Sequence, residues 1–130
     1  MIHKSIIVLI CLFTIKLSIA NAVTMNQVPI SPHVKTIDEL IEEKAKLYQV
    51  SPIVMHQVIK CESQYNPNAI GDGGHSRGLV QIYDDFHPTV THEQAFDPEF
   101  SITFLAKNLA QGNGHLWTCY RNLNIDSKAI

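Results

Sequence analysis

A single carboxylic acid, Glu62, lies where an apolar helical pattern ends and a glycine-rich loop begins. Met55, Val58 and Ile59 precede it at helical spacing, so Glu62 is expected on the face that turns toward the core. Burial disfavours the ionised form of a carboxyl group and raises its pKa. A carboxyl group that keeps its proton near neutral pH can act as a general acid, as the cleavage of a glycosidic bond requires.

The loop after Glu62 suits a cleft that binds a ligand, because glycine lets the backbone approach a ligand closely. Gln81, just beyond this loop, carries an amide that can bind a sugar. The alternative is that Glu62 is the last solvated residue of a helix and that the glycines form only a long turn. Periodicity alone favours this alternative. The glycines of the loop are Gly71, Gly73, Gly74 and Gly78.

Capping residues mark the helices that must position these groups. A capping box over 36–39 predicts a helix that runs to about Tyr48, and Ser51-Pro52 predicts the start of the next helix, which carries Glu62. Because Pro67 disfavours helix at the residue before it, this second helix must end upstream of that proline. Two later helices are expected, one beginning at Asp97-Pro98-Glu99 and a short one around Trp117 to Leu123.

The first residues are typical of a secretory signal peptide. A short basic start is followed by a mostly apolar stretch and by a small-residue cleavage site, Ala20-Asn21-Ala22. A membrane anchor is the alternative, which we disfavour because the apolar run is short and contains Lys16. No membrane-spanning segment is expected after cleavage. The predicted organisation is a signal peptide at 1–22, an extended leader at 23–34 and one domain at 35–130.

Export bears on the charge and the cysteines of the mature chain. The formal net charge is −2 and becomes more negative once the signal peptide leaves, which argues against nucleic acid as a partner. Cys61 and Cys119 remain, and an even pair of cysteines in an exported protein predicts a disulfide. Two free buried thiols are the alternative. The protein is therefore expected in the periplasm or outside the cell.

Three segments carry, in this order, a resemblance to a known family: Glu62-Ser63, Asn66-Pro67-Asn68-Ala69 and Gly78-Leu79-Val80-Gln81-Ile82. They resemble the core motif of the lytic transglycosylase SLT and lysozyme-like superfamily, and the likeness spans residues 36–121. The resemblance implies a mainly helical, α+β lysozyme-like fold with a glycine-rich loop or short β region beside the active-site cleft. Val80 replaces the usual methionine of the family, and the family's Tyr-Asn-Ala-Gly segment is absent.

The resemblance implies a lytic transglycosylase that cleaves the MurNAc–GlcNAc β-1,4 bond of peptidoglycan without a cofactor. Glu62 is then the single catalytic acid and afterwards the base. The substrate's own acetamido group assists departure, and its C6 hydroxyl attacks to give an anhydro-muramoyl end. Ser63 and Gln81 fall at positions that the family uses to orient the acid or hold the glycan, and Tyr120 is a candidate for the tyrosine that contacts the acid.

Two other functions stay open. A lysozyme-type muramidase, which is a hydrolase, needs a second carboxylate, for which Asp72, Asp84 and Asp85 are the candidates. The alternative is that these residues have no catalytic role. Asp72 is then a turn residue, and Asp84 and Asp85 are a solvated loop pair or a helix cap. A catalytically silent peptidoglycan-binding or assembly module is the third function, although the presence of Glu62 argues against it.

The histidines in the predicted loops do not indicate a metal site. The loop histidines lack a standard metal-ligand spacing, and Trp117 is expected either in the core or as a platform for a sugar. Peptidoglycan strands are the expected partner, and small exported domains of this kind also suggest a secretion or conjugation apparatus. Whether the wall belongs to the protein's own cell, to a competitor or to a host stays open. The loop histidines are His75, His87, His92 and His115.

Overall fold

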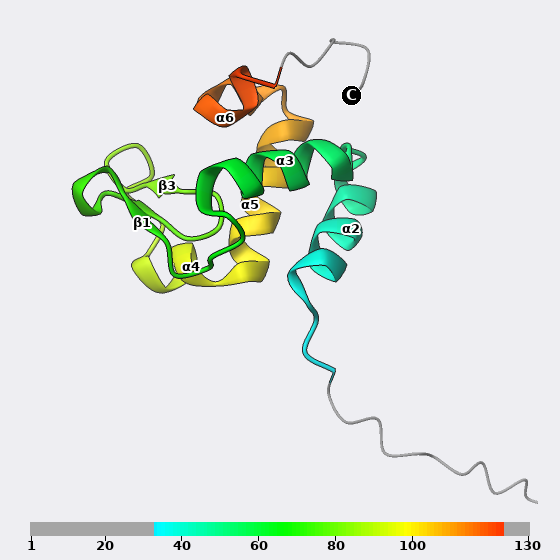
Figure 1. Cartoon of the computed structure of the whole chain (residues 1–130), viewed down its shortest axis with the longest axis horizontal. Coiled ribbons are helices and arrows are strands. Elements are labelled where there is room, and N and C mark those ends of the chain that lie inside the picture. The colour runs from blue at the N-terminus through cyan, green and yellow to red at the C-terminus, as the bar shows by residue number, and fades with distance from the viewer. Residues whose placement is uncertain (1–32, 124–130) are drawn as a thin grey trace, which may run out of the picture. The chain divides into compact units, whose positions relative to one another are not determined.

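The computed structural model describes residues 33–123 and shows a mainly helical domain with a small antiparallel sheet (Figure 1). The predicted α+β class is therefore confirmed. The predicted signal peptide at 1–22 lies outside the described residues. So do nearly all of the leader at 23–34 and the part of the predicted domain beyond Leu123.

Local capping chemistry sets where the first two helices begin. α2 (Ile37–Tyr48) starts at the predicted capping box, in which the Glu39 N–H donates to the Thr36 hydroxyl and the Thr36 N–H donates to the Glu39 carboxylate. α3 (Pro52–Ser63) starts with the Ser51 hydroxyl as its cap. Both predicted starts are confirmed, and each helix ends in a glutamine with left-handed backbone.

The third long helix, α5 (Pro98–Ala110), packs against α2 and contributes much of the core. It starts where predicted, because the Asp97 carboxylate accepts a hydrogen bond from the Phe100 N–H. Lys44, on the mostly apolar face of α2, reaches Glu99 at 2.6 Å, and this ion pair joins the two helices. The largest fully buried side chains are Ile41, Met55, Ile59, Leu79, Ile102, Leu105, Val58, Val80 and Ser101.

The glycine-rich loop forms a three-stranded antiparallel sheet that follows α3 (Figure 1). Its strands, in spatial order, are β1 (Ile70–Gly71), β2 (Ser76–Arg77) and β3 (Ile82–Tyr83). A 3-10 turn, η1 (Asp72–Gly74), joins the first two strands. The predicted short β region is therefore a real sheet, although each strand is only 2 residues long.

A short helix that the sequence did not lead us to expect, α4 (His92–Phe96), precedes α5 and packs against it. Thr91 and Gln94 form its capping box, so a local signal was present. Gly78 lies against this helix with a left-handed φ of 76°, and a Cβ there would come within 1.8 Å of the Ala95 carbonyl oxygen. Glycine is therefore required at this position, and it lets the loop pack directly on α4.

The C-terminal part of the described chain returns to the end of α3. It consists of η2 (Asn113–Leu116) and α6 (Thr118–Arg121), where the last helix was predicted. The predicted disulfide between Cys61 and Cys119 is present and links α3 to α6. Trp117 is buried, and its Nε1–H donates to a carbonyl oxygen of the segment before β3 at 2.7 Å, so this residue belongs to the core.

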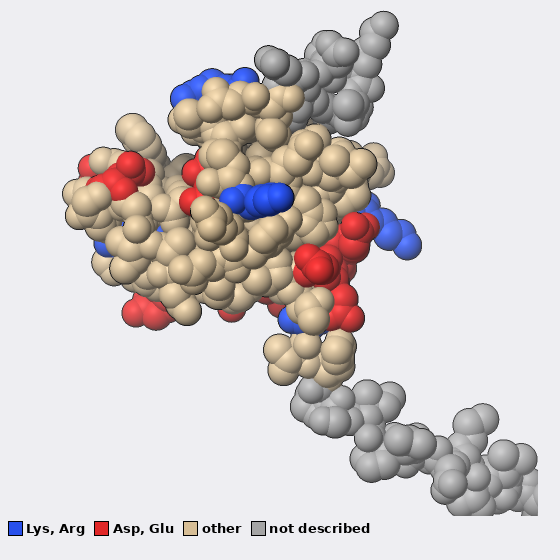
Figure 2. All heavy atoms as spheres, viewed as in Figure 1, with Lys and Arg blue, Asp and Glu red and all other residues tan. Residues whose placement is uncertain are grey.

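Charged side chains are distributed unevenly on the face that Figure 2 shows. Acidic side chains gather in separate groups, one of them over α2, and lysines and arginines are scattered singly. Among residues 33–123, no helix has both the length and the apolar character needed to span a bilayer. The acidic residues of α2 are Asp38, Glu39, Glu42 and Glu43.

Candidate active site

Glu62 lies in the last turn of α3, where this helix meets α6. Its side chain is half-buried, and its Oε1 accepts a hydrogen bond of 3.3 Å from the backbone N–H of Cys119. Main chain of α6, rather than a side chain, therefore contacts the carboxylate. The acid is neither fully enclosed in the core nor freely solvated. Its partial burial and its backbone donor both affect its pKa.

The pKa of Glu62 is raised above its usual value of 4.5, and burial is the largest cause. The Cys119 N–H acts in the opposite direction, because it stabilises the carboxylate. The charge of Asp72 raises the pKa further, and the charge of Arg121 lowers it. The site therefore keeps the proton on Glu62 to higher pH while it holds a donor ready for the anion that forms when the proton leaves.

A disulfide holds α6 beside the acid, and hydrogen bonds within η2 and α6 fix Arg121. The disulfide fastens Cys119 to Cys61, the residue that directly precedes the acid. The Arg121 guanidinium donates to the His115 carbonyl and to the Thr118 hydroxyl, each at 2.7 Å. These bonds fix the two groups of α6 that favour the carboxylate, one a backbone N–H and the other a positive charge.

Asp72 is the one of the three candidate second carboxylates whose charge acts on Glu62. It stands at the first position of η1 with a left-handed φ of 49°, and it accepts a hydrogen bond from the Ser76 hydroxyl. Asp72 is therefore a turn residue whose charge also acts on the acid.

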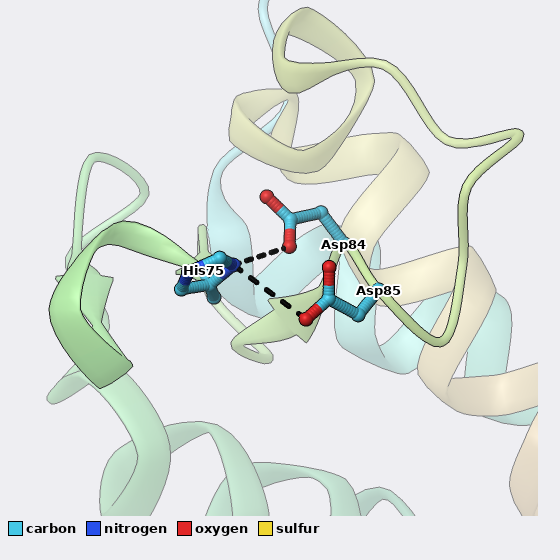
Figure 3. A group of neighbouring side chains, drawn as sticks. All are labelled: His75, Asp84 and Asp85. Carbon is cyan, nitrogen blue, oxygen red and sulfur yellow. Dashed lines mark hydrogen bonds and ion pairs between the residues drawn. The ribbon is translucent and has the colours of Figure 1, made fainter.

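The other two candidates, Asp84 and Asp85, form a separate cluster with His75 (Figure 3). His75 Nδ1 lies 2.9 Å from an Asp84 oxygen and 3.8 Å from an Asp85 oxygen. Arg77 donates to the second oxygen of Asp84 at 2.7 Å. The hydrogen bonds from Arg77 and His75 lower the pKa of Asp84 to about 2, so this carboxylate is ionised and paired.

Histidine and carboxylate are metal-ligating groups, and the ligand atoms of this cluster lie within 4.8 Å of one another. A cationic side chain is already part of it, because Arg77 binds Asp84. The ion pairs thus account for the cluster with protein groups alone.

Another loop histidine, His87, packs edge-on against Phe104 with ring centroids 4.9 Å apart, and burial lowers the pKa of His87.

Gln81 crosses between the two ends of the glycine-rich loop. Its Nε2 donates to the Gly78 carbonyl at 2.9 Å and to the Ala69 carbonyl at 3.3 Å. A Cβ on Gly71 would lie 2.4 Å from the Gln81 Oε1, so the absence of a side chain there leaves room for the amide. Gln81 therefore ties the loop together, and its contact with a glycan stays a prediction.

The structure does not join the other two predicted binding residues to the acid. Ser63 is buried, and its hydroxyl donates to the Ile59 carbonyl one helical turn earlier, at 3.2 Å. Tyr120 packs its ring on Gly114, where an added Cβ would come within 2.6 Å of the ring. In the described part of the chain, no hydrogen bond links either side chain to Glu62, and their roles stay predictions.

Sequence reasoning missed two features, a main-chain donor to the acid and a row of aromatic rings. The donor to Glu62 is the backbone N–H of Cys119, and a main-chain donor leaves no signal of its own in a sequence. The second feature is a row of three aromatic rings on and beside the sheet. Aromatic residues on both sides of the acidic pair at 84–85 were its sequence signal.

The site lies inside a region that a known family shares. The family model described as the transglycosylase SLT domain matches residues 39–125 of the chain. Neither a search of curated proteins nor a search of solved structures found a match. The match includes the acid, the sheet and α6, which are the parts of the candidate site.

Proposed function

We propose that this chain, which belongs to the transglycosylase SLT family of enzymes that act on peptidoglycan, is a lytic transglycosylase with Glu62 as its acid and then its base. The scissile bond is the β-1,4 bond between MurNAc and GlcNAc, and the product carries an anhydro-muramoyl end. One observation carries the proposal: Glu62 is half-buried, has a raised pKa and has a backbone donor on its Oε1.

In the first step, Glu62 gives its proton to the bridging oxygen as the bond from C1 of MurNAc to that oxygen breaks. The acetamido oxygen of the same sugar forms a bond to C1 and takes up the positive charge that develops there. Burial favours the protonated acid at the start of this step. The Cys119 N–H stabilises the carboxylate at its end, when the charge has developed.

In the second step, the Glu62 carboxylate takes the proton of the C6 hydroxyl, whose oxygen attacks C1 and displaces the acetamido oxygen. Glu62 is protonated again, and the sugar has an internal C1–O6 bond. No water is consumed. Since the substrate supplies both the assisting group and the nucleophile, one protein carboxyl group suffices.

The test is mass spectrometry of muropeptides released from purified peptidoglycan by the wild type and by Glu62→Gln. We expect anhydro-muramoyl ends from the wild type and a rate lowered by about 10² to 10⁴-fold in the variant, as general acid catalysis contributes. Glutamine keeps an oxygen that can accept the Cys119 N–H, so a folded but inactive variant lacks only the proton. Release at the wild-type rate would overturn the proposal, and binding without release by either protein would favour a silent binding module.

A lysozyme-type muramidase is the second candidate, because the charge of Asp72 acts on Glu62. Asp72 would then be the second carboxylate, and water would produce reducing MurNAc ends. The variant Asp72→Asn separates the two reactions. A transglycosylase should keep forming anhydro ends in this variant, whereas reducing ends that disappear with Asp72 would favour the hydrolase.

We also propose that the protein works outside the cytoplasm, where peptidoglycan lies. The family and the disulfide support this location, since disulfides persist in oxidising compartments. N-terminal sequencing of the exported protein tests the predicted processing. A mature chain that starts at Val23 is expected, and an uncleaved chain retained in the cytoplasm would contradict it.

A further inference from the structure

Three aromatic rings form a continuous row beside the sheet. His75 and Tyr83 are stacked, with centroids 5.5 Å apart and planes inclined by 17°. Phe86 follows, with its centroid 5.1 Å from that of Tyr83 and an inclination of 35°. The Phe86 residue is 79% exposed, so most of the surface of its ring is open to solvent.

The row is anchored at the end opposite Phe86. His75 is held by Asp84 at 2.9 Å, and Asp84 is held by Arg77 at 2.7 Å. Tyr83 is fixed by its place in β3. The exposed Phe86 ring therefore rests on an ordered support, and a ligand that contacts it needs to order fewer groups on binding.

The sheet joins the ring row to Asp72, whose charge acts on the acid. Tyr83 stands opposite Ser76 in the sheet, and the Ser76 hydroxyl donates to Asp72. Asp72 therefore adjoins the ring row through Ser76, and its charge acts on the acid.

We propose that Phe86, supported by Tyr83, forms a subsite that stacks a sugar ring of the glycan strand, away from the bond that is cleaved. The inference rests on the proposed function and extends it. GlcNAc and MurNAc carry equatorial substituents, so the faces of their rings present C–H bonds. These C–H bonds carry a small positive charge, which the negative face of an aromatic ring attracts.

The test measures binding of peptide-free glycan strands to the full chain in a Glu62→Gln background, so that the strands are not cut. Phe86→Ala should raise the Kd about tenfold, the size of one good aromatic contact. Phe86→Trp should bind at least as well as the parent, because it keeps a ring. Ile53→Ala is the matched control, since Ile53 is also exposed, at 68%, but lies at the start of α3, far along the helix from the acid.

A third variant, Phe86→Leu, distinguishes ring stacking from a general apolar contact. It should bind as weakly as Phe86→Ala, and parent-like binding would overturn the stacking subsite. An unchanged Kd for Phe86→Ala, or no strand binding by the parent, would overturn it as well. Turnover by the protein with Glu62 intact is measured separately. A failure of the proposed reaction therefore appears in turnover, and a failure of the subsite appears in binding.

Discussion

The backbone N–H of Cys119 donates to Oε1 of Glu62 across 3.3 Å, and the sulfur of Cys119 is bonded to the residue that precedes Glu62. The same residue therefore contacts the acid through its main chain and fixes that contact through its side chain. Since α6 is only 4 residues long, it has little internal structure to keep this geometry without the disulfide.

The double variant Cys61→Ser/Cys119→Ser tests this relationship. On the loop-entropy model we expect the free energy of unfolding to fall by about 4 kcal/mol. We also expect turnover to fall by at least about tenfold at a temperature where circular dichroism shows the fold intact, since small displacements of catalytic groups are costly. The wild type in a reducing agent should show the same losses of stability and turnover. Full turnover by the folded double variant would show that the disulfide serves stability alone.

The pH dependence of the reaction should follow Glu62. The reaction needs the protonated acid, so kcat/KM falls as pH rises through the pKa of Glu62. Because burial raises this pKa above 4.5, the alkaline limb of the profile should lie above that value. A profile of kcat/KM with soluble glycan strands measures it. A limb centred at or below pH 4.5 would contradict the raised pKa or the role of Glu62.

Replacing the acid should change stability in the opposite sense to activity. A folded-state pKa above the unfolded value means that stability is fully present below the unfolded pKa and is lost as pH rises through the folded pKa. Glu62→Gln removes this loss. Its Tm should therefore exceed that of the wild type at pH 7, and the two values should converge below pH 4. Equal Tm values at both pH values would show that the ionised acid carries no such cost.

The pKa of His75, the residue just before β2, should depend unequally on its two acidic neighbours. The hydrogen bond to Asp84 is the first cause of the raised pKa of His75, and Asp85 is more distant. In NMR titrations, Asp84→Asn should return the His75 pKa most of the way to its usual 6.5, and Asp85→Asn should shift it less. The reverse order would contradict the described pairing. This ion pair favours the fold chiefly between pH 3.8 and 6.5, where both groups are charged in either state.

Two glycines with left-handed backbone offer a matched pair for stability. Gly78→Ala places a Cβ 1.8 Å from a carbonyl oxygen, whereas Gly73→Ala meets nothing within 4 Å. Gly73→Ala should cost only the backbone strain, about 1 to 2 kcal/mol. Gly78→Ala should cost about 3 kcal/mol or more, because overpacking adds to the strain. Urea denaturation measures both, and equal losses would contradict the close packing of Gly78 on α4.

The helices could be predicted because their signals are local. The capping box at 36–39, the Ser51-Pro52 start and the Asp97 cap each act within one turn, so neighbouring residues are enough to recognise them. Helical periodicity placed Glu62 on the core-facing stripe, but periodicity alone favoured a solvated helix end, and the structure shows the side chain half-buried. The short helix α4 was overlooked although its capping box was equally local.

The remaining features depend on contacts between distant residues. The Cys119 N–H meets Glu62 across 57 positions, and no periodicity predicts such a contact. The need for glycine at 78 comes from the Ala95 carbonyl on another element. Tyr120 turned toward Gly114, a packing preference that its own neighbours in sequence do not reveal. These are tertiary choices, which local propensity does not determine.

The disulfide makes the stretch from Cys61 to Cys119 a closed covalent ring, and this ring contains the acid and the whole sheet. A protease that cut one peptide bond inside the ring would release no fragment. The two pieces would still migrate together on a non-reducing gel and would separate only after reduction. A single nick in the mostly exposed stretch at 85–89 would thus leave Glu62 and its backbone donor in one molecule.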